Sequence, residues 1–327
     1  MVSFGASWAS IFAKLMPSGQ DVNSGGDEIL YSTETFTYKT VDDHEVRADV
    51  YRYPDEEIRP AIIWLHPGAL IFGSRKDVPA EQVKRYVEAG YVVVAVDHRL
   101  APETKLAAII EDLMDAYVWI RSEGPDLFKI DPARVVVVGH SAGGYLALMA
   151  GFRLEPRPKA LVSFYGYGDI TGLWISDSSS YNQMAPVSRD QAHAFVGDSV
   201  VSSDPLGPNW PDGRPQFYIY TRQQSIWLEE VSGRDPKEDA AWFSAYEPIR
   251  NVSSAYPPVL LLHGEKDSDV PFEKSVQLAR AFERHGLEYE FITNPDWGHV
   301  FDFSGMEDPE VQNAFRQVLS FLEKHVR

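Results

Sequence analysis

The 327-residue sequence contains no cysteine, and this absence excludes several kinds of chemistry. Disulfide frameworks, thiol nucleophiles and cysteine-based zinc or iron–sulfur sites all require that residue. A chain of this length can bury a large hydrophobic core, so it needs neither disulfides nor metals for stability. With 44% hydrophobic and 24% charged residues, the composition is typical of a globular protein and not of a disordered one.

Basic residues are scarce. Lys and Arg total 30 against 48 Asp and Glu, which gives a formal net charge of −18. Such a surface repels phosphate backbones, so we expect no nucleic-acid partner. Neutral substrates should suit it better than anionic ones.

Long apolar runs are also missing, and none approaches the roughly 18 residues that a membrane span requires. We therefore expect no stable membrane insertion. Residues 1–18 place apolar side chains at helical spacing around Lys14, and they lack the continuous apolar core of a signal peptide. These patterns predict a cytoplasmic protein in which residues 1–30 form an N-terminal helical cap segment.

From about residue 60 onward, β-like and helical stretches alternate. The expected strands are 61–66, 91–96, 134–138, 161–164, 259–262 and 288–293, and the expected helices are 80–89, 106–122, 145–154, 272–285 and 310–325. Alternation of this kind is typical of a parallel sheet with helices on both faces. Residues 33–40 and 45–53 alternate in polarity and predict an antiparallel edge. The expected fold class is therefore α/β, with a mostly parallel eight-stranded sheet.

The interval between residues 166 and 258 breaks the alternation, because a parallel crossover needs only a dozen or so residues. It is rich in aromatic residues and interrupted by Pro and Gly. Long insertions within compact domains usually serve as lids or binding loops; an extra subdomain with its own small core is the alternative. We expect a catalytic domain of residues 31–165 and 251–327 with an inserted lid or cap over 166–250.

A candidate nucleophile lies between a valine-rich strand and a helix. Residues 139–144 read Gly-His-Ser-Ala-Gly-Gly, which matches the G-x-S-x-G nucleophile elbow. In so tight a turn the positions two before and two after the serine must lack side chains. The following helix points its positive N-terminus at the site. Ser141 is therefore the predicted nucleophile.

A serine hydroxyl needs a base to take its proton. His299 follows the last expected strand, and imidazole titrates near neutral pH. Asp267 follows the preceding strand and would hold the His299 tautomer. Asp269 competes for that role, and its alternative role is a helix N-cap. The chain order Ser141, Asp267, His299 is that of α/β-hydrolases.

Four segments together resemble the hormone-sensitive-lipase-like carboxylesterases of the α/β-hydrolase superfamily. They are His66-Pro67-Gly68-Ala69, the run DHRLAPE over 97–103, the elbow, and the acid turn over 263–271. The resemblance implies an α/β-hydrolase fold. It also implies an oxyanion hole made by the backbone N–H groups of Gly68, Ala69 and Ala142.

This sequence departs from the family pattern at two places. Pro67 has no N–H, but it falls where no donor is required, and Ala69 must adopt backbone angles that glycine takes freely. His140 replaces the aspartate of the family and so removes a negative charge beside the nucleophile. Arg99 and Glu103 are expected in an Arg–carboxylate network that fixes the loop after strand 91–96.

The resemblance implies a serine hydrolase that cleaves carboxylic esters of small to medium, apolar or aromatic substrates, with no metal or organic cofactor. The expected partner is a small-molecule ester or amide, and homodimers are common in the family. The alternatives are an amide or formamide hydrolase similar to kynurenine formamidases, and a natural-product thioesterase or lactonase. A ligand-binding receptor is the non-enzymatic alternative, but such receptors have lost the histidine that His299 supplies here.

Overall fold

The computed structural model describes residues 31–207, 210–303 and 305–326. The helical cap predicted over residues 1–30 lies outside this range. Eight strands form one sheet in the order β1-β2-β4-β3-β5-β6-β7-β8. Their bounds are β1 (Ser32–Val41), β2 (His44–Arg52), β3 (Arg59–Leu65), β4 (Val92–Val96), β5 (Ile130–His140), β6 (Leu161–Phe164), β7 (Val259–Gly264) and β8 (Tyr289–Asn294).

The β1–β2 and β2–β4 pairs are antiparallel, and the pairs from β4 to β8 are parallel. The expected mostly parallel sheet with an antiparallel edge is therefore confirmed. All residues of β4, β6 and β7 are buried, as their apolar runs predict for strands covered on both faces. Parallel strands direct their carboxyl ends to one edge, where the loops after β3, β5, β7 and β8 meet.

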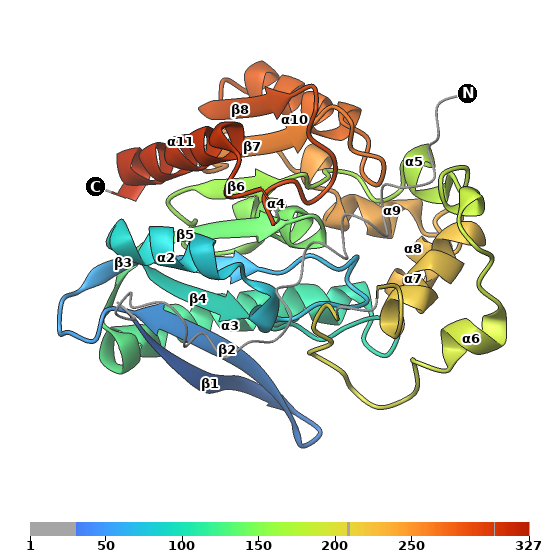
Figure 1. The fold of residues 1–327 in the computed structure, drawn as a ribbon, viewed down its shortest axis with the longest axis horizontal. Coiled ribbons are helices and arrows are strands. Elements are labelled where there is room, and N and C mark those ends of the chain that lie inside the picture. The colour runs from blue at the N-terminus through green and yellow to red at the C-terminus, as the bar shows by residue number, and fades with distance from the viewer. Residues whose placement is uncertain (1–30, 208–209, 304, 327) are drawn as a thin grey trace.

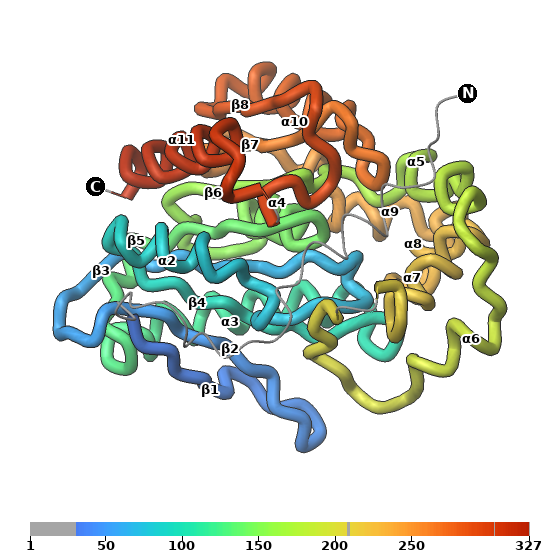
Figure 2. Tube along the Cα trace, viewed as in Figure 1, coloured from blue at the N-terminus to red at the C-terminus, as the bar shows by residue number. Residues whose placement is uncertain are grey.

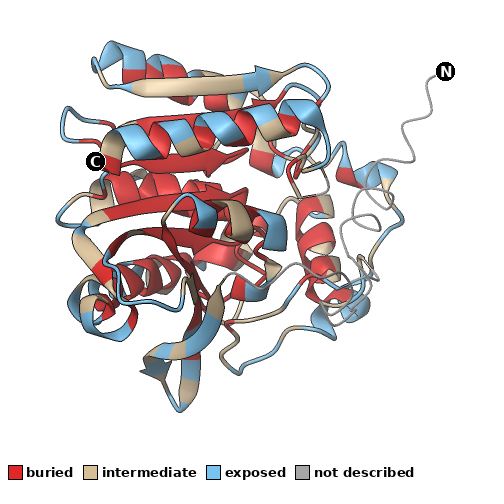
Figure 3. Ribbon diagram, turned by 60° about the vertical axis from the view of Figure 1, so that its left-hand side comes forward, coloured by how far each residue is buried: buried red, intermediate tan, exposed pale blue. Residues whose placement is uncertain are grey.

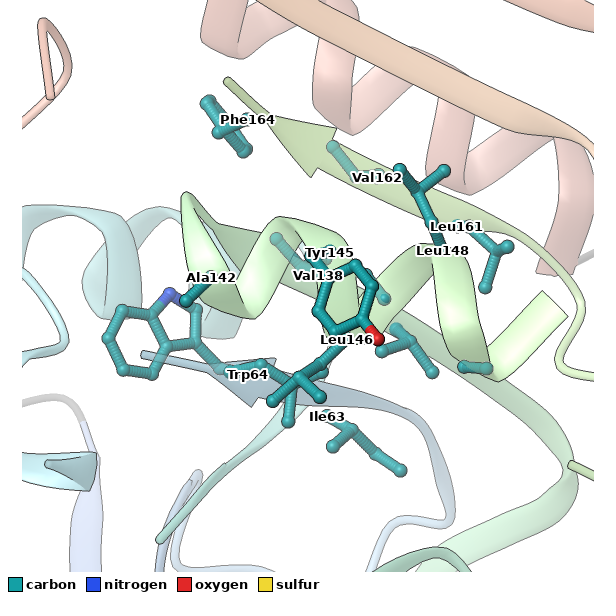
Figure 4. Close-up of a cluster of buried hydrophobic side chains, with 14 of the residues drawn as sticks. Ile63, Trp64, Val138, Ala142, Tyr145, Leu146, Leu148, Leu161, Val162 and Phe164 are labelled. Atoms are coloured by element: carbon teal, nitrogen blue, oxygen red, sulfur yellow. The ribbon is translucent and has the colours of Figure 1, made fainter. Parts of the chain in front are cut away.

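Helices cover both faces of the sheet (Figure 1). One face carries α2 (Ala80–Glu88) and α11 (Pro309–Val326), and the other carries α3 (Leu106–Phe128), α4 (Ala142–Arg153) and α10 (Glu273–Arg284). The outer helices have a buried side toward the sheet and an exposed side toward solvent (Figure 3). The central helix α4 packs against β3, β5 and β6, and its Leu146 lies in one hydrophobic cluster with Trp64 of β3 and Val138 of β5 (Figure 4).

Helix α3 extends beyond the end expected at residue 122, so that prediction was wrong. The helix passes Gly124 and Pro125 and ends at Phe128, and Lys129 follows in the left-handed conformation with φ 58°. Phe128 is buried, and a Cβ at position 124 would lie 2.7 Å from its ring. Tertiary burial of Phe128 therefore outweighs the local break that Gly-Pro favours.

The chain between β6 and β7 is an insertion, defined here as residues 166–258, in which short helices are joined by irregular segments. It contains α5 (Leu173–Ser176), α6 (Arg189–His193), α7 (Arg214–Gln223), α8 (Trp227–Ser232) and α9 (Ala240–Phe243), with 3-10 turns η2 (Tyr181–Gln183), η3 (Ser244–Tyr246) and η4 (Pro248–Arg250). A further turn, η1 (Arg75–Asp77), follows β3. Figure 2 traces the excursion of the insertion around one end of the sheet. Its role as a lid, and the domain boundaries drawn around it, stay predictions.

No helix in the described ranges combines the length and the apolar character needed to cross a membrane.

Candidate active site

Ser141 stands at the junction of β5 and α4 in a strained conformation, with φ 55° and ψ −116°. A Cβ at Gly139 would lie 2.0 Å from the carbonyl oxygen of Gly143, and a Cβ at Gly143 would lie 2.2 Å from that of Leu65. Both contacts are with backbone atoms that cannot move aside cheaply. The G-x-S-x-G spacing therefore has a direct steric cause, and the turn projects the hydroxyl at the edge of the sheet.

The three residues predicted from the sequence are brought together. The hydroxyl of Ser141 lies 3.0 Å from His299 Nε2, and His299 Nδ1 lies 2.7 Å from Asp267 Oδ2. With Nδ1–H donating to Asp267, Nε2 is the nitrogen that can accept the Ser141 proton. The catalytic roles of these residues stay predictions, but the geometry is that of a nucleophile, a base and an orienting carboxylate.

Asp267 is held rigidly in its buried position. Its Oδ1 accepts the backbone N–H groups of Asp269 and Val270, both at 2.9 Å, and its Oδ2 lies 3.1 Å from His263 Nε2. Burial alone would raise the pKa of this carboxyl, but the charge of His299 and the hydrogen bonds from His263 and His299 hold it well below its usual range. Burial alone would lower the pKa of His299, but Asp267, Asp269 and Asp302 together outweigh burial and raise it.

Asp269, the competing acid, does not occupy the position facing Nδ1. Its alternative role as a helix N-cap was also wrong, because α10 begins at Glu273 after Phe272 and has no side-chain cap. Instead Asp269 lines the pocket in front of Ser141 and accepts hydrogen bonds from Tyr181 and Tyr218 of the insertion.

The loop after β3, where the oxyanion hole is expected, has an unusual backbone conformation. Gly68, Ala69 and Leu70 all have positive φ, at 124°, 55° and 62°, so Ala69 does adopt an angle that usually favours glycine. The Gly68 carbonyl accepts the N–H groups of Ile71 and Phe72 and closes the turn. No described residue accepts a hydrogen bond from the N–H of Gly68, Ala69 or Ala142. Donation to an oxyanion by these groups stays a prediction.

This oxyanion loop, residues 67–72, is supported from two directions. The N–H of Ala101, in the DHRLAPE run, donates to the Leu70 carbonyl at 2.8 Å. From the insertion, Trp227 Nε1 donates to the Ala69 carbonyl at 3.1 Å, and Arg214 Nε donates to that of Ile71 at 2.7 Å. The backbone angles of the loop therefore depend on side chains far away in the sequence.

Among these supporting residues, Arg214 makes the largest number of hydrogen bonds. Its guanidinium donates to both carboxylate oxygens of Glu103, at 2.9 and 2.7 Å, and to the Ala101 carbonyl at 2.6 Å. The expected Arg–carboxylate network thus exists, but as two separate pairs. Glu103 binds Arg214, whereas Arg99 binds the buried Asp112 of α3.

His140, which replaces the aspartate of the family, points into the core. Its ring stacks on Phe164 with centroids 4.3 Å apart, and its Nε2 lies 3.0 Å from Asp302 Oδ2. Asp302 also accepts hydrogen bonds from Tyr165 and Gln82, both at 2.7 Å. Burial alone would raise the pKa of Asp302, but the charge of His140 and these hydrogen bonds lower it. The exchange at position 140 is therefore matched by a buried carboxylate.

A pocket opens in front of Ser141 and His299. The oxyanion loop forms one side, and the insertion supplies Leu206, Trp210 and Tyr218. Phe72 and Val300 complete a largely apolar wall. Asp269 contributes a carboxylate to the lining of the pocket. Among the described residues, no group of three or more His, Asp or Glu side chains could hold a metal ion.

Several residues around the site were missed from the sequence. The aromatic content of the insertion pointed to Trp210 and Tyr218 as a group. Nothing in the local pattern singled out Arg214, or Arg222, which donates a hydrogen bond to Tyr218 Oη. Asp302 lies three residues after His299, and the loss of the aspartate at position 140 was the one signal that could have suggested a compensating carboxylate.

Comparison with known proteins agrees with this architecture. The family model described as BD-FAE matches residues 48–282. Among solved structures, an α/β hydrolase superfamily protein from Enterococcus faecalis superposes with a TM-score of 0.70 at 25% identity, covering 90% of this chain and 99% of that one. A thermophilic esterase from Thermogutta terrifontis, with propionate bound, gives 0.63 at 22% identity over 89% and 94%. The predicted α/β-hydrolase fold is confirmed.

Curated relatives of similar sequence are much larger proteins. The non-reducing polyketide synthase Preu6 of Preussia isomera is 29% identical over 308 residues, which are 85% of this chain but 14% of that protein. The chain therefore spans a small fraction of the length of these relatives, and the match concerns one hydrolase-like region of them.

Proposed function

The chain belongs to the BD-FAE family, and from this premise we propose that it is a serine hydrolase that cleaves carboxylic esters through an acyl-enzyme on Ser141. The observation that carries the proposal is the continuous hydrogen-bonded relay of Ser141, His299 and Asp267 at the base of a pocket. The esterases among its structural neighbours support hydrolase activity in general.

The proposed reaction has two steps. In the first, the Ser141 oxygen attacks the ester carbonyl while His299 Nε2 takes its proton, and Asp267 stabilises the imidazolium. The N–H groups of Gly68, Ala69 and Ala142 then stabilise the tetrahedral anion, and His299 protonates the departing alcohol. In the second step, water loses a proton to His299 and attacks the acyl-enzyme, which releases the acid and restores Ser141.

The pocket supports a small to medium acyl group of apolar or aromatic character. Its walls are mostly apolar, as is usual for small-molecule sites. Phe72, Trp210 and Tyr218 line the pocket and would contact an apolar or aromatic acyl group.

A second candidate is a thioesterase that releases an aromatic acyl group from a thioester. The similarity to non-reducing polyketide synthases favours it. The same nucleophile and oxyanion hole serve both reactions, and a thiolate leaves with less help from His299 than an alkoxide does. The amide-hydrolase alternative stays a prediction, without a specific observation in its favour.

A matched panel tests these proposals. Ethyl esters and N-acetylcysteamine thioesters of the same benzoic and short aliphatic acids would be offered to the wild type, to Ser141→Ala and to Ser268→Ala. Ser141→Ala should lose at least about 10⁴-fold in kcat/KM. Ser268→Ala alters an exposed serine of the acid turn and should keep full activity.

Two results would contradict the proposal: full activity of Ser141→Ala, or no cleavage of any ester or thioester by the wild type. A strong preference for thioesters of the same acid would select the second candidate. Labelling of Ser141 by an organophosphonate, read by mass spectrometry, would report on the nucleophile independently of the substrate.

A further inference from the structure

Two carboxylates flank the imidazole of His299, one at each ring nitrogen. Asp267 contacts Nδ1 at 2.7 Å, whereas Asp269 Oδ2 lies 3.5 Å from Nε2, the nitrogen that faces Ser141. The Asp269 side chain is 9% exposed and forms part of the pocket wall. A relay of serine, histidine and one aspartate does not account for this second carboxylate.

Building on the proposed hydrolase function, we propose that Asp269 is a positioning residue that acts through His299, and that the insertion holds its carboxylate beside Nε2. It would stabilise the imidazolium formed when Ser141 gives up its proton. The insertion would thereby control the strength of the base as well as the shape of the pocket.

The support for Asp269 comes from the insertion. Its Oδ1 accepts hydrogen bonds from Tyr181 Oη and from Tyr218 Oη, the latter at 2.8 Å. Arg222 Nη1 donates to Tyr218 Oη at 3.0 Å and lies 3.6 Å from Asp269 Oδ1. With Oδ1 engaged by two hydroxyl groups, the side chain is fixed in the orientation that directs Oδ2 at His299.

The sign of the effect follows from the charges that face His299. Asp267 and Asp269 reach it from the loop between β7 and α10, and Asp302 acts from the histidine's own loop. The neutral groups Ser141 and Tyr165, which directly follow β5 and β6, also contact it, and the ring centroids of Tyr165 and His299 are 4.7 Å apart. Each carboxylate raises the pKa of His299 and burial lowers it, so removing Asp269 should lower that pKa.

Arg222 limits the effect of Asp269 on the pKa of His299, because its buried guanidinium partly compensates the charge of the Asp269 carboxylate. An opposite charge at this range shifts a pKa by about 1 to 3 units, so we expect Asp269→Asn to lower the pKa of His299 by about one unit. The variant keeps the shape of the side chain and an oxygen for the tyrosines. At pH values well below the pKa, its kcat/KM relative to the wild type should rise by up to about tenfold.

The test is an NMR titration of the histidine Cε1–H resonances in the full chain, with the His299 signal assigned by its loss in His299→Gln. Asp269→Asn would be compared with Asp296→Asn, which removes an equal charge from the His299 loop. Asp296 is exposed and pairs with Lys266, so its removal should leave the pKa of His299 in place.

A His299 pKa that is the same in Asp269→Asn and in the wild type would overturn the proposal. If Asp269→Asn fails to fold, Arg222→Gln tests the proposal instead. Loss of the Arg222 cation leaves the Asp269 charge uncompensated and should raise the pKa of His299. An unchanged or lower pKa refutes the role of Asp269. The titration needs no substrate. Failure of this inference is therefore distinguishable from failure of the proposed hydrolase function, which the ester panel reports.

Discussion

Replacing Arg214 by methionine should destabilise the protein and slow catalysis together, because this side chain joins the insertion to the oxyanion loop. The guanidinium donates to the carbonyl of Ile71 within the loop, to that of Ala101 beside it, and to both oxygens of Glu103. The Arg214 and Glu103 side chains are 5% and 2% exposed, so solvent screens the pair weakly.

The magnitude follows from that burial. Removing one partner of a buried ion pair leaves an uncompensated charge and costs about 3–5 kcal/mol in the free energy of unfolding. Arg214 holds the pKa of Glu103 below its usual value although burial alone would raise it, so the carboxylate is charged at neutral pH. If the loop shifts enough to misplace one oxyanion donor, kcat should fall by about 10²–10³-fold with little change in KM.

Urea unfolding and ester kinetics on three variants would measure both effects. Arg214→Met tests the loss of the cation. The double variant Arg214→Met/Glu103→Gln also removes the stranded charge and should recover about 1–3 kcal/mol. Arg85→Met is the control, because Arg85 pairs with Glu81 one turn away on the exposed side of α2, and its loss should cost less than about 1 kcal/mol.

Equal destabilisation by Arg214→Met and Arg85→Met would refute this reasoning. So would a double variant no more stable than Arg214→Met, since the unpaired carboxylate would then not be the cause. A normal kcat in a folded Arg214→Met protein would show that the other two supports hold the oxyanion loop without it.

Two further predictions concern the elbow and a buried histidine pair. Gly143→Ala should destabilise the protein by about 1–3 kcal/mol or more and abolish esterase activity, because its Cβ would lie 2.2 Å from a backbone oxygen. Gly197 has open space around it, so Gly197→Ala should behave as wild type in the same unfolding and activity assays. His66 and His98 are buried and stacked 4.4 Å apart, and burial lowers the pKa of both. At these two positions the unfolded chain therefore binds more protons than the folded one below about pH 6.5. The contribution of this pair to the free energy of unfolding, measured in urea, should become less favourable from pH 7 to pH 5. His98→Asn should flatten that dependence, and an unchanged slope would contradict the assignment.

The sequence was most informative where local pattern and burial agree. Valine runs such as 92–96 predict strands covered on both faces, and the glycines around Ser141 predict a turn whose steric cause the structure shows. The loops carrying Asp267 and His299 follow from strand order. Supports that depend on distant contacts could not be predicted, because Arg214 meets Glu103 across 111 residues and Tyr218 meets Asp269 across 51.

The attachment of the insertion at Glu103 and at Asp269 limits how this protein can be recombined. Exchanging residues 166–258 with those of another hydrolase would remove Arg214, Tyr181 and Tyr218 while leaving their two acidic partners behind. Each stranded carboxylate would then face the pocket or the oxyanion loop without its donors. A functional chimera has to transfer positions 103 and 269 of the catalytic domain together with the insertion. The substrate range of this scaffold therefore cannot be changed by exchanging the insertion alone.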